Sequence, residues 1–567
     1  MTVSPSDSDA PPLDPRRWIA FAVVLAAGFM DLLDVTIVNV AVPSIQNDLK
    51  AEYSQLEWIV AAYVLSFAAV LITGGRLGDI YGRKRVFLVG MAGFTLASLA
   101  CGLSDTPAVL IGSRFVQGAF AGLMVPQILA TIRVTFPKHE RAKAIALYSG
   151  VGGSASAVGL SLGGVLVQAN LFDLGWRPIF LVNVPVGVVA LVAAFAVMRD
   201  SRSTAAPRLD IPGMVLAVAA VLLLVYPLTE GRRLGWPTWT FAMMAAAASV
   251  FATFVAYERR RARTVGSPLI DLDLFRSRPF TVGLAAWLLF WIGLGGFFLV
   301  WTLFMQAGLG WTPLRAGLTA VCFAVGAGIG AGTSVNVLAP RWGRAVLIAG
   351  GLITAAGFVF YGWSAARYEG EFASWQMIAP LVVTGAGFGM VVAPTIDMLL
   401  GQVPAREAGA AAGLLTTGQQ LGTALGVALV GVVFFGQLDQ DSARGVTAVT
   451  PETRAELSAQ GMPAPATDEI LTNFAACVRD RSAQADPTAI PPSCRPSPVA
   501  TPAVAQTLSR SGAQANAVNF AHTFYYTLGI GAGLLVLVSL GFLALPGNAR
   551  LEQHEADPET DDELIGV

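Results

Sequence analysis

Three charged side chains, Asp31, Asp34 and Arg114, stand inside long apolar stretches of this sequence. At 1.5 Å per helical residue, Asp34 lies about 12 Å below Pro43, which ends its stretch. Arg114 lies about 10 Å below Pro107, which begins its own stretch. The two stretches are the first and fourth of a series and cross a membrane in opposite directions, so an Asp34–Arg114 pair is geometrically possible. Charges are costly inside a bilayer, and each of these needs a partner or a function.

Asp31 and Asp34 share one helix face, because they are three residues apart. Two carboxylates this close do not both ionise easily in a low dielectric, whereas Arg114 would hold one of them ionised. A carboxyl group that exchanges a proton near neutral pH suits a proton-coupled carrier, and a free carboxylate could also attract a cationic substrate. The alternative is a permanently ionised cluster that only holds helices together.

A glycine-rich segment with placed charges follows the second apolar stretch. Its glycines allow a tight turn and close helix approach, and its acidic and basic residues can cap or pair at helix ends. Ordinary positive-inside anchoring would explain the basic residues but not the glycines and the aspartate. The candidate residues of this motif are Gly75, Gly78, Asp79, Gly82 and Arg83.

The fifth apolar stretch carries Gly159, Gly163 and Gly164 among other small residues. Such a face permits close and bendable packing against another helix. A hinge or a sealed contact between two parts of the protein is the functional interpretation, and generic tight packing is the structural one.

Several residues could line a substrate cavity. Aromatic side chains of the ninth stretch share one face, although packing in lipid or in a core is their commoner role. Asp397, near the inner end of the twelfth stretch, could bind a cation or a proton, with a solvated helix end as the alternative. The cavity candidates are Asn39, Tyr63, Gln117, Trp287, Trp291 and Asp397.

The elements that position these residues are predicted to be membrane-spanning helices, each needing about 20 apolar residues. The first stretch is too long for a cleaved signal peptide and has no small-residue cleavage site. Fourteen stretches meet the requirement: 18–42, 57–75, 86–103, 108–132, 144–168, 177–198, 211–229, 239–257, 281–305, 316–338, 345–366, 376–400, 409–435 and 520–545.

The basic residues set the expected orientation. With the N-terminus in the cytoplasm, the inside segments carry 23 lysines and arginines and the short outside loops carry 6. Basic residues concentrate on the cytoplasmic side of membrane proteins. We therefore expect a multi-pass protein of the bacterial inner membrane with both termini cytoplasmic.

A weak internal repeat at an offset of about 265 residues indicates two six-helix halves in the same orientation. Gly118, for example, recurs as Gly385, and Glu140 recurs as Glu407. The fold class is therefore an all-α membrane protein with two six-helix halves and an inserted two-helix hairpin. The expected parts are a cytoplasmic tail (1–17), an N-terminal half (18–198), the hairpin (199–257), a cytoplasmic linker (258–280), a C-terminal half (281–545) that contains an outside loop (436–519), and a second tail (546–567).

The outside loop contains Cys477 and Cys494 as its only cysteines. Disulfides persist in oxidising surroundings, so these two are candidates for a bond, with two idle thiols in a disordered loop as the alternative. Cys101 and Cys322 fall within spans and read as small core residues.

Composition excludes several classes of protein. Only 13% of the 567 residues are charged and 54% are hydrophobic, which is unlike a cytosolic enzyme or a nucleic-acid binder with a basic face. Three histidines far apart and four cysteines make a metal centre improbable. None of the four lysines follows a glycine, so no ATP-binding phosphate loop exists. No nucleophile–base set stands out, and we expect no enzyme, no cofactor and no nucleic-acid or ATP partner.

Four segments resemble motifs of the major facilitator superfamily, in particular its fourteen-span drug:proton antiporters of the EmrB/QacA type. The segments are 33–43 (LDVTIVNVAVP), 75–85 (GRLGDIYGRKR), 114–118 (RFVQG) and 176–187 (WRPIFLVNVPVG). One departure is Leu160, which stands where the fifth-helix antiporter motif has a proline.

The resemblance implies export of hydrophobic or cationic drugs or antibiotics, driven by the proton gradient. It implies that Asp31, Asp34 and Arg114 handle protons and that Asp79 and Arg83 belong to a cytoplasmic latch. Leu160 weakens the inference of strict antiport. The alternatives are a symporter or uniporter for a small nutrient, and a membrane sensor or scaffold that transports nothing.

Overall fold

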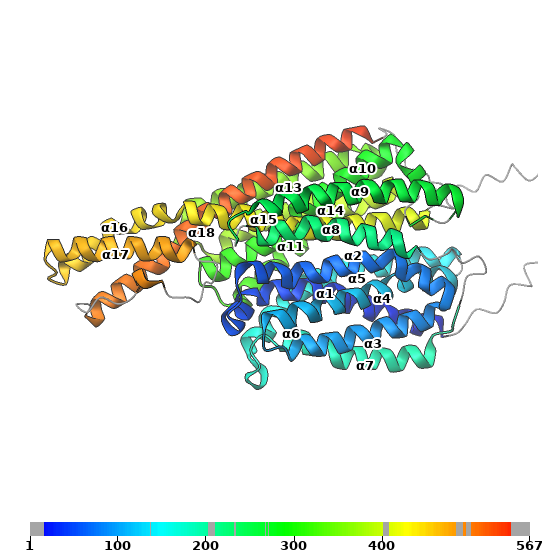
Figure 1. Ribbon diagram of the computed structural model, residues 1–567, viewed down its shortest axis with the longest axis horizontal. Coiled ribbons are helices and arrows are strands. Elements are labelled where there is room, and N and C mark those ends of the chain that lie inside the picture. Colours follow the sequence, from blue (N-terminus) through cyan, green and yellow to red (C-terminus); the bar gives the residue numbers. More distant parts are fainter. Residues whose placement is uncertain are drawn as a thin grey trace, which may run out of the picture.

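The computed structural model shows a helical bundle from which one end protrudes (Figure 1). It describes residues 16–136, 138–201, 210–231, 234–266, 268–269, 272–400, 408–483, 491–494 and 501–545. These residues form helices and short connections, with no strand among them. Most of both expected terminal tails lies outside the described residues.

The N-terminal half contains six long apolar segments, the sixth of which is formed by two consecutive helices, α6 (Pro178–Leu181) and α7 (Asn183–Val197). Thr106 shows how one begins: its side chain accepts a hydrogen bond from the Val109 amide at 3.3 Å, and Pro107 occupies the first turn, where it leaves no bond unmade. The first five segments are α1 (Arg17–Leu49), α2 (Tyr53–Tyr81), α3 (Arg83–Gly102), α4 (Pro107–Thr135) and α5 (Lys138–Ala169), and a 3₁₀ turn at Leu171–Asp173 follows α5.

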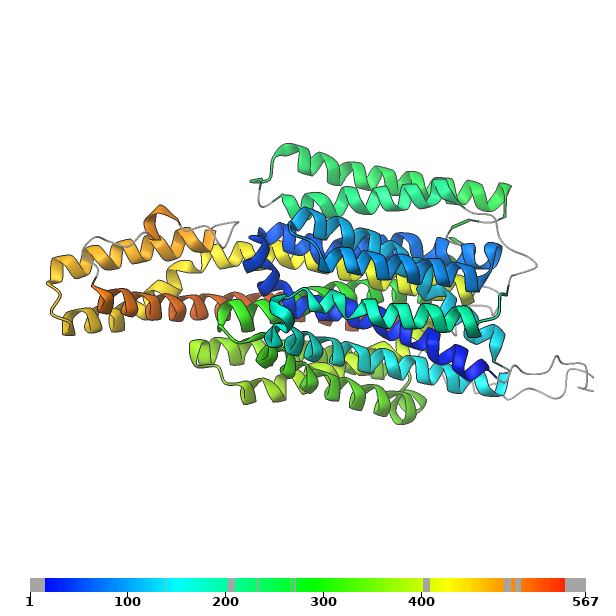
Figure 2. The same cartoon turned by 90° about the horizontal axis from the view of Figure 1, so that it is seen from below.

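A helical hairpin, α8 (Ile211–Glu230) and α9 (Thr238–Thr264), follows the N-terminal half. Asp210 caps α8 by accepting a hydrogen bond from the Gly213 amide at 2.9 Å. Figure 2 shows the hairpin, in green, along one side of the bundle. Its helix α8 packs against both α2 and α15, which belong to different halves.

The C-terminal half repeats the plan of the N-terminal half. Its helices are α10 (Arg278–Leu303), α11 (Pro313–Thr333), α12 (Ala339–Trp342), α13 (Ala345–Tyr368), α14 (Ile378–Leu400), α15 (Ala408–Gln440) and α18 (Pro502–Gly541). Short 3₁₀ or π turns extend or join them at Leu272–Arg276, Phe304–Gly308, Ser334–Leu338, Glu369–Glu371, Ser374–Met377 and Phe542–Ala544.

Equivalent helices pack in equivalent ways in the two halves. The pairs α1–α5, α2–α4 and α3–α7 have counterparts in α10–α15, α11–α14 and α13–α18. The contacts between halves also come as a pair, α5 with α11 and α2 with α15. The repeat that a few glycines indicated in the sequence is thus present in the packing.

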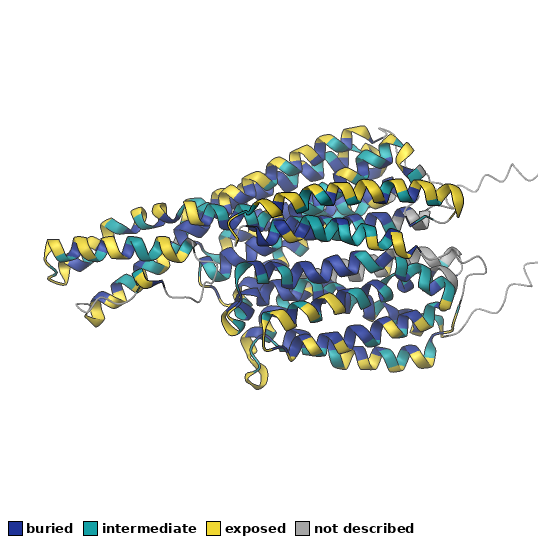
Figure 3. Cartoon of the chain, in the orientation of Figure 1, coloured by how far each residue is buried: buried dark blue, intermediate teal, exposed yellow. Residues whose placement is uncertain are grey.

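Each of the fourteen predicted spans falls on a helix or on two consecutive helices. Among the described residues, 13 helices are long and apolar enough to cross a membrane. The remaining predicted span, 144–168, lies within α5. Buried residues fill the centre of both halves, and exposed ones cover the rim and the protruding end (Figure 3).

The protruding end comprises residues that the sequence indicated as a loop. It contains α16 (Ser442–Ala459), α17 (Ala464–Ala483), a 3₁₀ turn (Pro492–Cys494) and the adjoining ends of α15 and α18. The composition was too poor in large apolar residues to indicate helices. The spacing, however, is helical: Val449, Thr453 and Leu457 recur every four residues and are all buried.

Cys477 and Cys494 form the disulfide that the sequence predicts, which ties the 3₁₀ turn to α17. Cys101 is buried in α3, as expected for a core residue.

Candidate functional site

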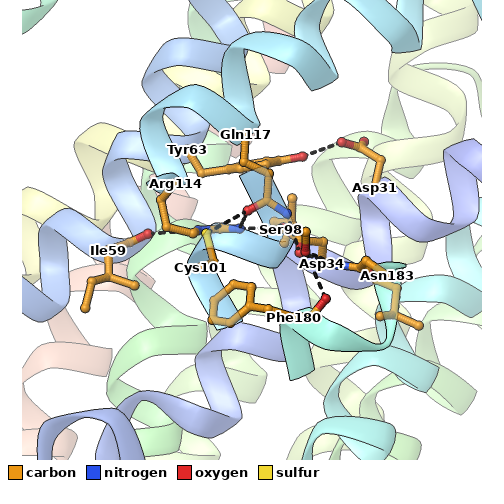
Figure 4. A network of polar contacts seen from close by, with 12 residues as sticks. Asp31, Asp34, Ile59, Tyr63, Ser98, Cys101, Arg114, Gln117, Phe180 and Asn183 are labelled. Carbon is orange, nitrogen blue, oxygen red and sulfur yellow. Dashed lines mark hydrogen bonds and ion pairs between the residues drawn. The ribbon is translucent and has the colours of Figure 1, made fainter. Parts of the chain in front are cut away.

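A buried ion pair lies at the centre of the N-terminal half (Figure 4). Nη1 of Arg114 lies 2.5 Å from Oδ2 of Asp34, and the two side chains are 1% and 0% exposed. The other carboxylate oxygen of Asp34 accepts hydrogen bonds from Gln117 Nε2 at 2.9 Å and from Asn183 Nδ2 at 2.8 Å. The two carboxylate oxygens of Asp34 therefore receive three donors from two helices, α4 and α7.

Arg114 is held in place by acceptors on two helices and by two rings. Its Nε donates to the carbonyl of Ile59 at 3.2 Å, and its Nη1 also donates to Gln117 Oε1 at 2.8 Å. Its Cζ lies 4.2 Å from the ring centroid of Tyr63 and 5.6 Å from that of Phe180. Such cation–π contacts strengthen when they are desolvated, as these are.

Asp31 occupies a different environment from Asp34. It is 4% exposed, and its Oδ1 accepts a hydrogen bond from the hydroxyl of Tyr63 at 2.5 Å. Tyr63 links Asp31 to Arg114, because its ring lies over the guanidinium of Arg114 and its hydroxyl points to Asp31 (Figure 4). Asp31 is thus close enough to the ion pair to sense its field but is not part of it.

The network continues to α3 and to the junction of α6 and α7. Asn183 donates to Ser98 Oγ at 3.1 Å, and Ser98 donates to the carbonyl of Phe180 at 2.9 Å. The Cys101 thiol lies 3.5 Å from Gln117 Oε1. The network therefore joins helices α1, α2, α3, α4, α6 and α7.

Helical spacing assembles this site from three short pairs. Asp31 and Asp34 are one turn apart on α1, Arg114 and Gln117 one turn apart on α4, and Ile59 and Tyr63 one turn apart on α2. The Asp34–Arg114 pairing expected from depth is present.

Tyr63 and Gln117 take part in the hydrogen-bond network, and their place in a substrate cavity stays a prediction. Ser98 and Asn183 were not singled out. Each is a polar residue inside an otherwise apolar span, and this is the feature of the sequence that could have identified it as a site residue.

Three of the other cavity candidates, Trp287, Trp291 and Asn39, contact residues that are not part of the network. Trp287 is 1% exposed and donates to the carbonyl of Leu415 at 2.9 Å. Trp291 packs edge-on against Phe388 with ring centroids 5.9 Å apart. Asn39 donates to Val35 of its own helix at 3.3 Å. The side chain of Asp397 lies outside the part of the chain that the structure describes.

The glycine-rich motif surrounds the junction of α2 and α3. Gly82 has a φ of 105°, which only glycine adopts readily, and its amide bonds to the Gly78 carbonyl at 3.0 Å. Asp79 and Arg83 pair with each other at 2.8 Å. The backbone of Arg83 also bonds to Ser201 at 3.0 Å. Gly75 lies nearby on α2, and a latch across the two halves stays a prediction.

The glycines of α5 permit close approach to two different helices. A side chain at Gly159 or Gly163 would collide with Leu33, Thr36 or Ile37 of α1. A Cβ at Gly164 would lie 2.5 Å from the carbonyl of Pro313 in α11, and therefore in the opposite half. The motif is thus both a packing surface and a contact between halves.

The chain also matches a known family of membrane proteins. The family model described as Major Facilitator Superfamily matches residues 24–427. The chain belongs to this superfamily. It is a multi-pass protein of the cell membrane.

Two relatives show the extent of the likeness within the superfamily. The chain is 38% identical to a "Probable actinorhodin transporter" of Streptomyces coelicolor over 96% of its own length and 94% of that protein. It is 36% identical to a "Tetracenomycin C resistance and export protein" of Streptomyces glaucescens, over 74% and 76% of the two chains.

Solved transporter structures share the fold. The chain resembles a bacterial homologue of the human lysosomal transporter Spinster, crystallised inward-facing and unoccupied, with a TM-score of 0.58 and 15% identity. The match covers 95% of this chain and 100% of that structure. At this identity the likeness concerns architecture alone.

Proposed function

We propose that this superfamily member exports a hydrophobic or cationic antibiotic-like molecule in exchange for protons. The observation that carries the proposal is the buried acid network, in which Asp31 neighbours a fully satisfied Asp34–Arg114 pair. Relatives named for antibiotic transport, resistance and export support the class of substrate.

Two acids with unequal environments suit two roles. Asp34 is held by three donors, and we assign it the role of joining the helices of the N-terminal half. Asp31 has the Tyr63 hydroxyl as its donor and is the group we assign to proton exchange. When Asp31 is neutral, the field on Arg114 changes, and the helices that share the network repack. When Asp31 is ionised, it attracts a cationic substrate.

The cycle as proposed needs no cofactor, no ATP and no covalent step. Asp31 takes a proton while it faces the outside and releases it while it faces the cytoplasm, where substrate binds. One charge that crosses a potential of 100 mV contributes about 2.3 kcal/mol, so the gradient favours one direction.

The test is export from proteoliposomes that contain the purified full-length chain under an imposed pH gradient. With ethidium as a hydrophobic cationic probe, we expect gradient-driven export by the parent and a loss of at least tenfold in Asp31→Asn. The control is Asp105→Asn, because Asp105 is 90% exposed and pairs with Arg177, which is not a residue of the network. Accumulation in place of export would favour an importer, and undiminished pH-driven export by Asp31→Asn would overturn the coupling assignment.

A further inference from the structure

An apolar pocket lies between the inserted hairpin and the two halves. Its empty volume is about 790 Å³, which includes the solvent at its open mouth. The walls come from α2, α4, α8, α9 and α15 together with the linker after α9. The lining includes Ser66, Val218, Phe254, Leu269 and Thr417.

The lining contains a hydroxyl group that could form a hydrogen bond with a ligand. Almost every wall residue is aliphatic or aromatic, and the hydroxyl of Ser66 already donates to the Tyr63 carbonyl at 3.1 Å. Thr417 Oγ1 differs, because it is buried and has no hydrogen-bond partner among the described residues. A buried hydroxyl left without a partner destabilises the protein, because it has lost its hydrogen bonds to water. A ligand with a carbonyl or hydroxyl group would remove that cost.

The pocket lies where the halves meet. Leu65 and Ser66 come from the N-terminal half, whereas Thr417 and Leu421 come from the C-terminal half. The hairpin closes the pocket from the side, since α8 packs on both α2 and α15. A molecule bound in this pocket would contact all three parts of the protein.

The pocket is also next to the proton network. Ser66 lines it and bonds to Tyr63, whose hydroxyl holds Asp31. A ligand here would therefore lie within one turn of α2 from the residue that bonds the acid.

A buried charge cluster fixes the linker end of the pocket. The amide of Leu269, a lining residue, donates to Glu258 Oε2 at 2.7 Å, and Arg76 donates to the carbonyl of Pro268. Asp210 pairs with Arg261 at 3.1 Å beside them. These contacts hold the linker against α2 and α9, so this wall is a built part of the site.

We propose that this pocket binds the transported molecule after it leaves the membrane and before the transport step. Its ligand is then a mostly apolar, flat molecule with one hydrogen-bonding group. The proposal rests on the function proposed above. It commits to the substrate as occupant because the pocket joins both halves, adjoins the acid network and has an unused hydroxyl. A phospholipid acyl chain would fill the apolar volume but would have no use for Thr417.

The first experiment is photo-crosslinking in proteoliposomes with Nile red, a neutral dye with a carbonyl group. Val218 in the full-length chain is replaced by p-benzoylphenylalanine. The matched control places it at Val215, a neighbouring position on α8 that is 56% exposed and is not among the residues that line the pocket. We expect saturable labelling at 218 that ethidium or excess dye displaces, and only linear labelling at 215. Linear labelling at both positions overturns the proposal, as do phospholipid adducts at 218 that dye does not displace.

The second experiment removes the hydroxyl of Thr417 and, in a separate variant, fills the pocket at Val218. Thr417→Val keeps the shape and removes the hydroxyl, so half-saturation of labelling at 218 should require about three- to tenfold more dye, as expected for one hydrogen bond. Val218→Trp fills the pocket and should raise the KM for export of Nile red at least fivefold, while Val215→Trp leaves it unchanged. Equal KM values for both tryptophan variants contradict the proposal. A parent that shows no pH-driven export contradicts the proposed function instead. Labelling at 218 then still decides whether the pocket binds the dye.

Discussion

At the scale of single residues, the two acids of α1 differ in how completely their oxygens are used. Asp34 has a guanidinium and two amide groups as donors, and Asp31 has a phenol. A buried ion pair that loses one partner leaves an uncompensated charge, whereas a carboxyl group bound to one hydroxyl tolerates protonation. This difference supports the proposal above, in which Asp34 contributes stability and Asp31 exchanges the proton.

Asp34→Asn should destabilise the protein by about 3–5 kcal/mol, because it leaves Arg114 buried without its counter-charge. Asp31→Asn should cost far less, since an amide can still accept from Tyr63. Thermal unfolding of the detergent-solubilised variants measures both. Equal unfolding temperatures for Asp34→Asn and the parent would show that the pair contributes no stability.

Sequence could predict the ion pair but not its surroundings. Counting 1.5 Å per residue was enough to bring Asp34 and Arg114 to one depth. Which residues complete the shell depends on the rotation of α3 and α7 about their own axes. That rotation follows from packing of apolar faces, and hydropathy alone does not specify it for Ser98 or Asn183.

At the scale of elements, glycine sets how closely the halves meet. A Cβ at Gly317 of α11 would lie 2.5 Å from the carbonyl of Leu160 in α5, and Ser161 Oγ lies 3.4 Å from the carbonyl of Gly317. The contact is therefore one of backbone on backbone. Leu160 stands where the family motif has proline, and its carbonyl is the atom that receives Gly317.

Gly317→Ala should separate α5 from α11 and disfavour the arrangement seen in this structure. Forcing a methyl group into such a contact costs about 1–3 kcal/mol. Spin labels at Val165 and Leu318, both exposed, should report a longer distance in the variant. The matched control is Gly328→Ala on the same helix, where a Cβ would meet nothing within 4 Å. Identical distance distributions in the two variants would show that this contact does not govern the arrangement of the halves.

The helices α16 and α17 show where prediction from composition stops. Membrane spans are recognised because twenty apolar residues have few other uses. A short extramembrane helix needs only a narrow apolar stripe, and in residues 442–483 that stripe is made partly of Ser, Thr and Ala. The four-residue spacing was present, but it was hidden by a composition typical of a loop.

At the scale of the whole molecule, the protein consists of a transport bundle and an attached helical end with its own small cores. One core contains Val449, Phe474 and Ala515, and another contains Leu457, Leu471 and Val504. Neither includes a residue of the acid network or of the pocket beside the hairpin. The transport cycle proposed above therefore does not require α16 or α17.

This separation gives the last prediction. A side chain at Gly445 would collide with the backbone of Ala515, so the two segments are close enough to join by a short linker. Replacing residues 446–514 with a few glycines and serines should leave a folded carrier with export within about twofold of the parent, because the cost of closing a loop grows slowly with its length. The paired control, Cys477→Ser with Cys494→Ser in the full chain, removes the disulfide and keeps the helices. A shortened chain that folds and no longer exports, beside a disulfide-free chain that does, would mean that the helical end takes part in transport, and the sensor or scaffold alternative would then gain its first support.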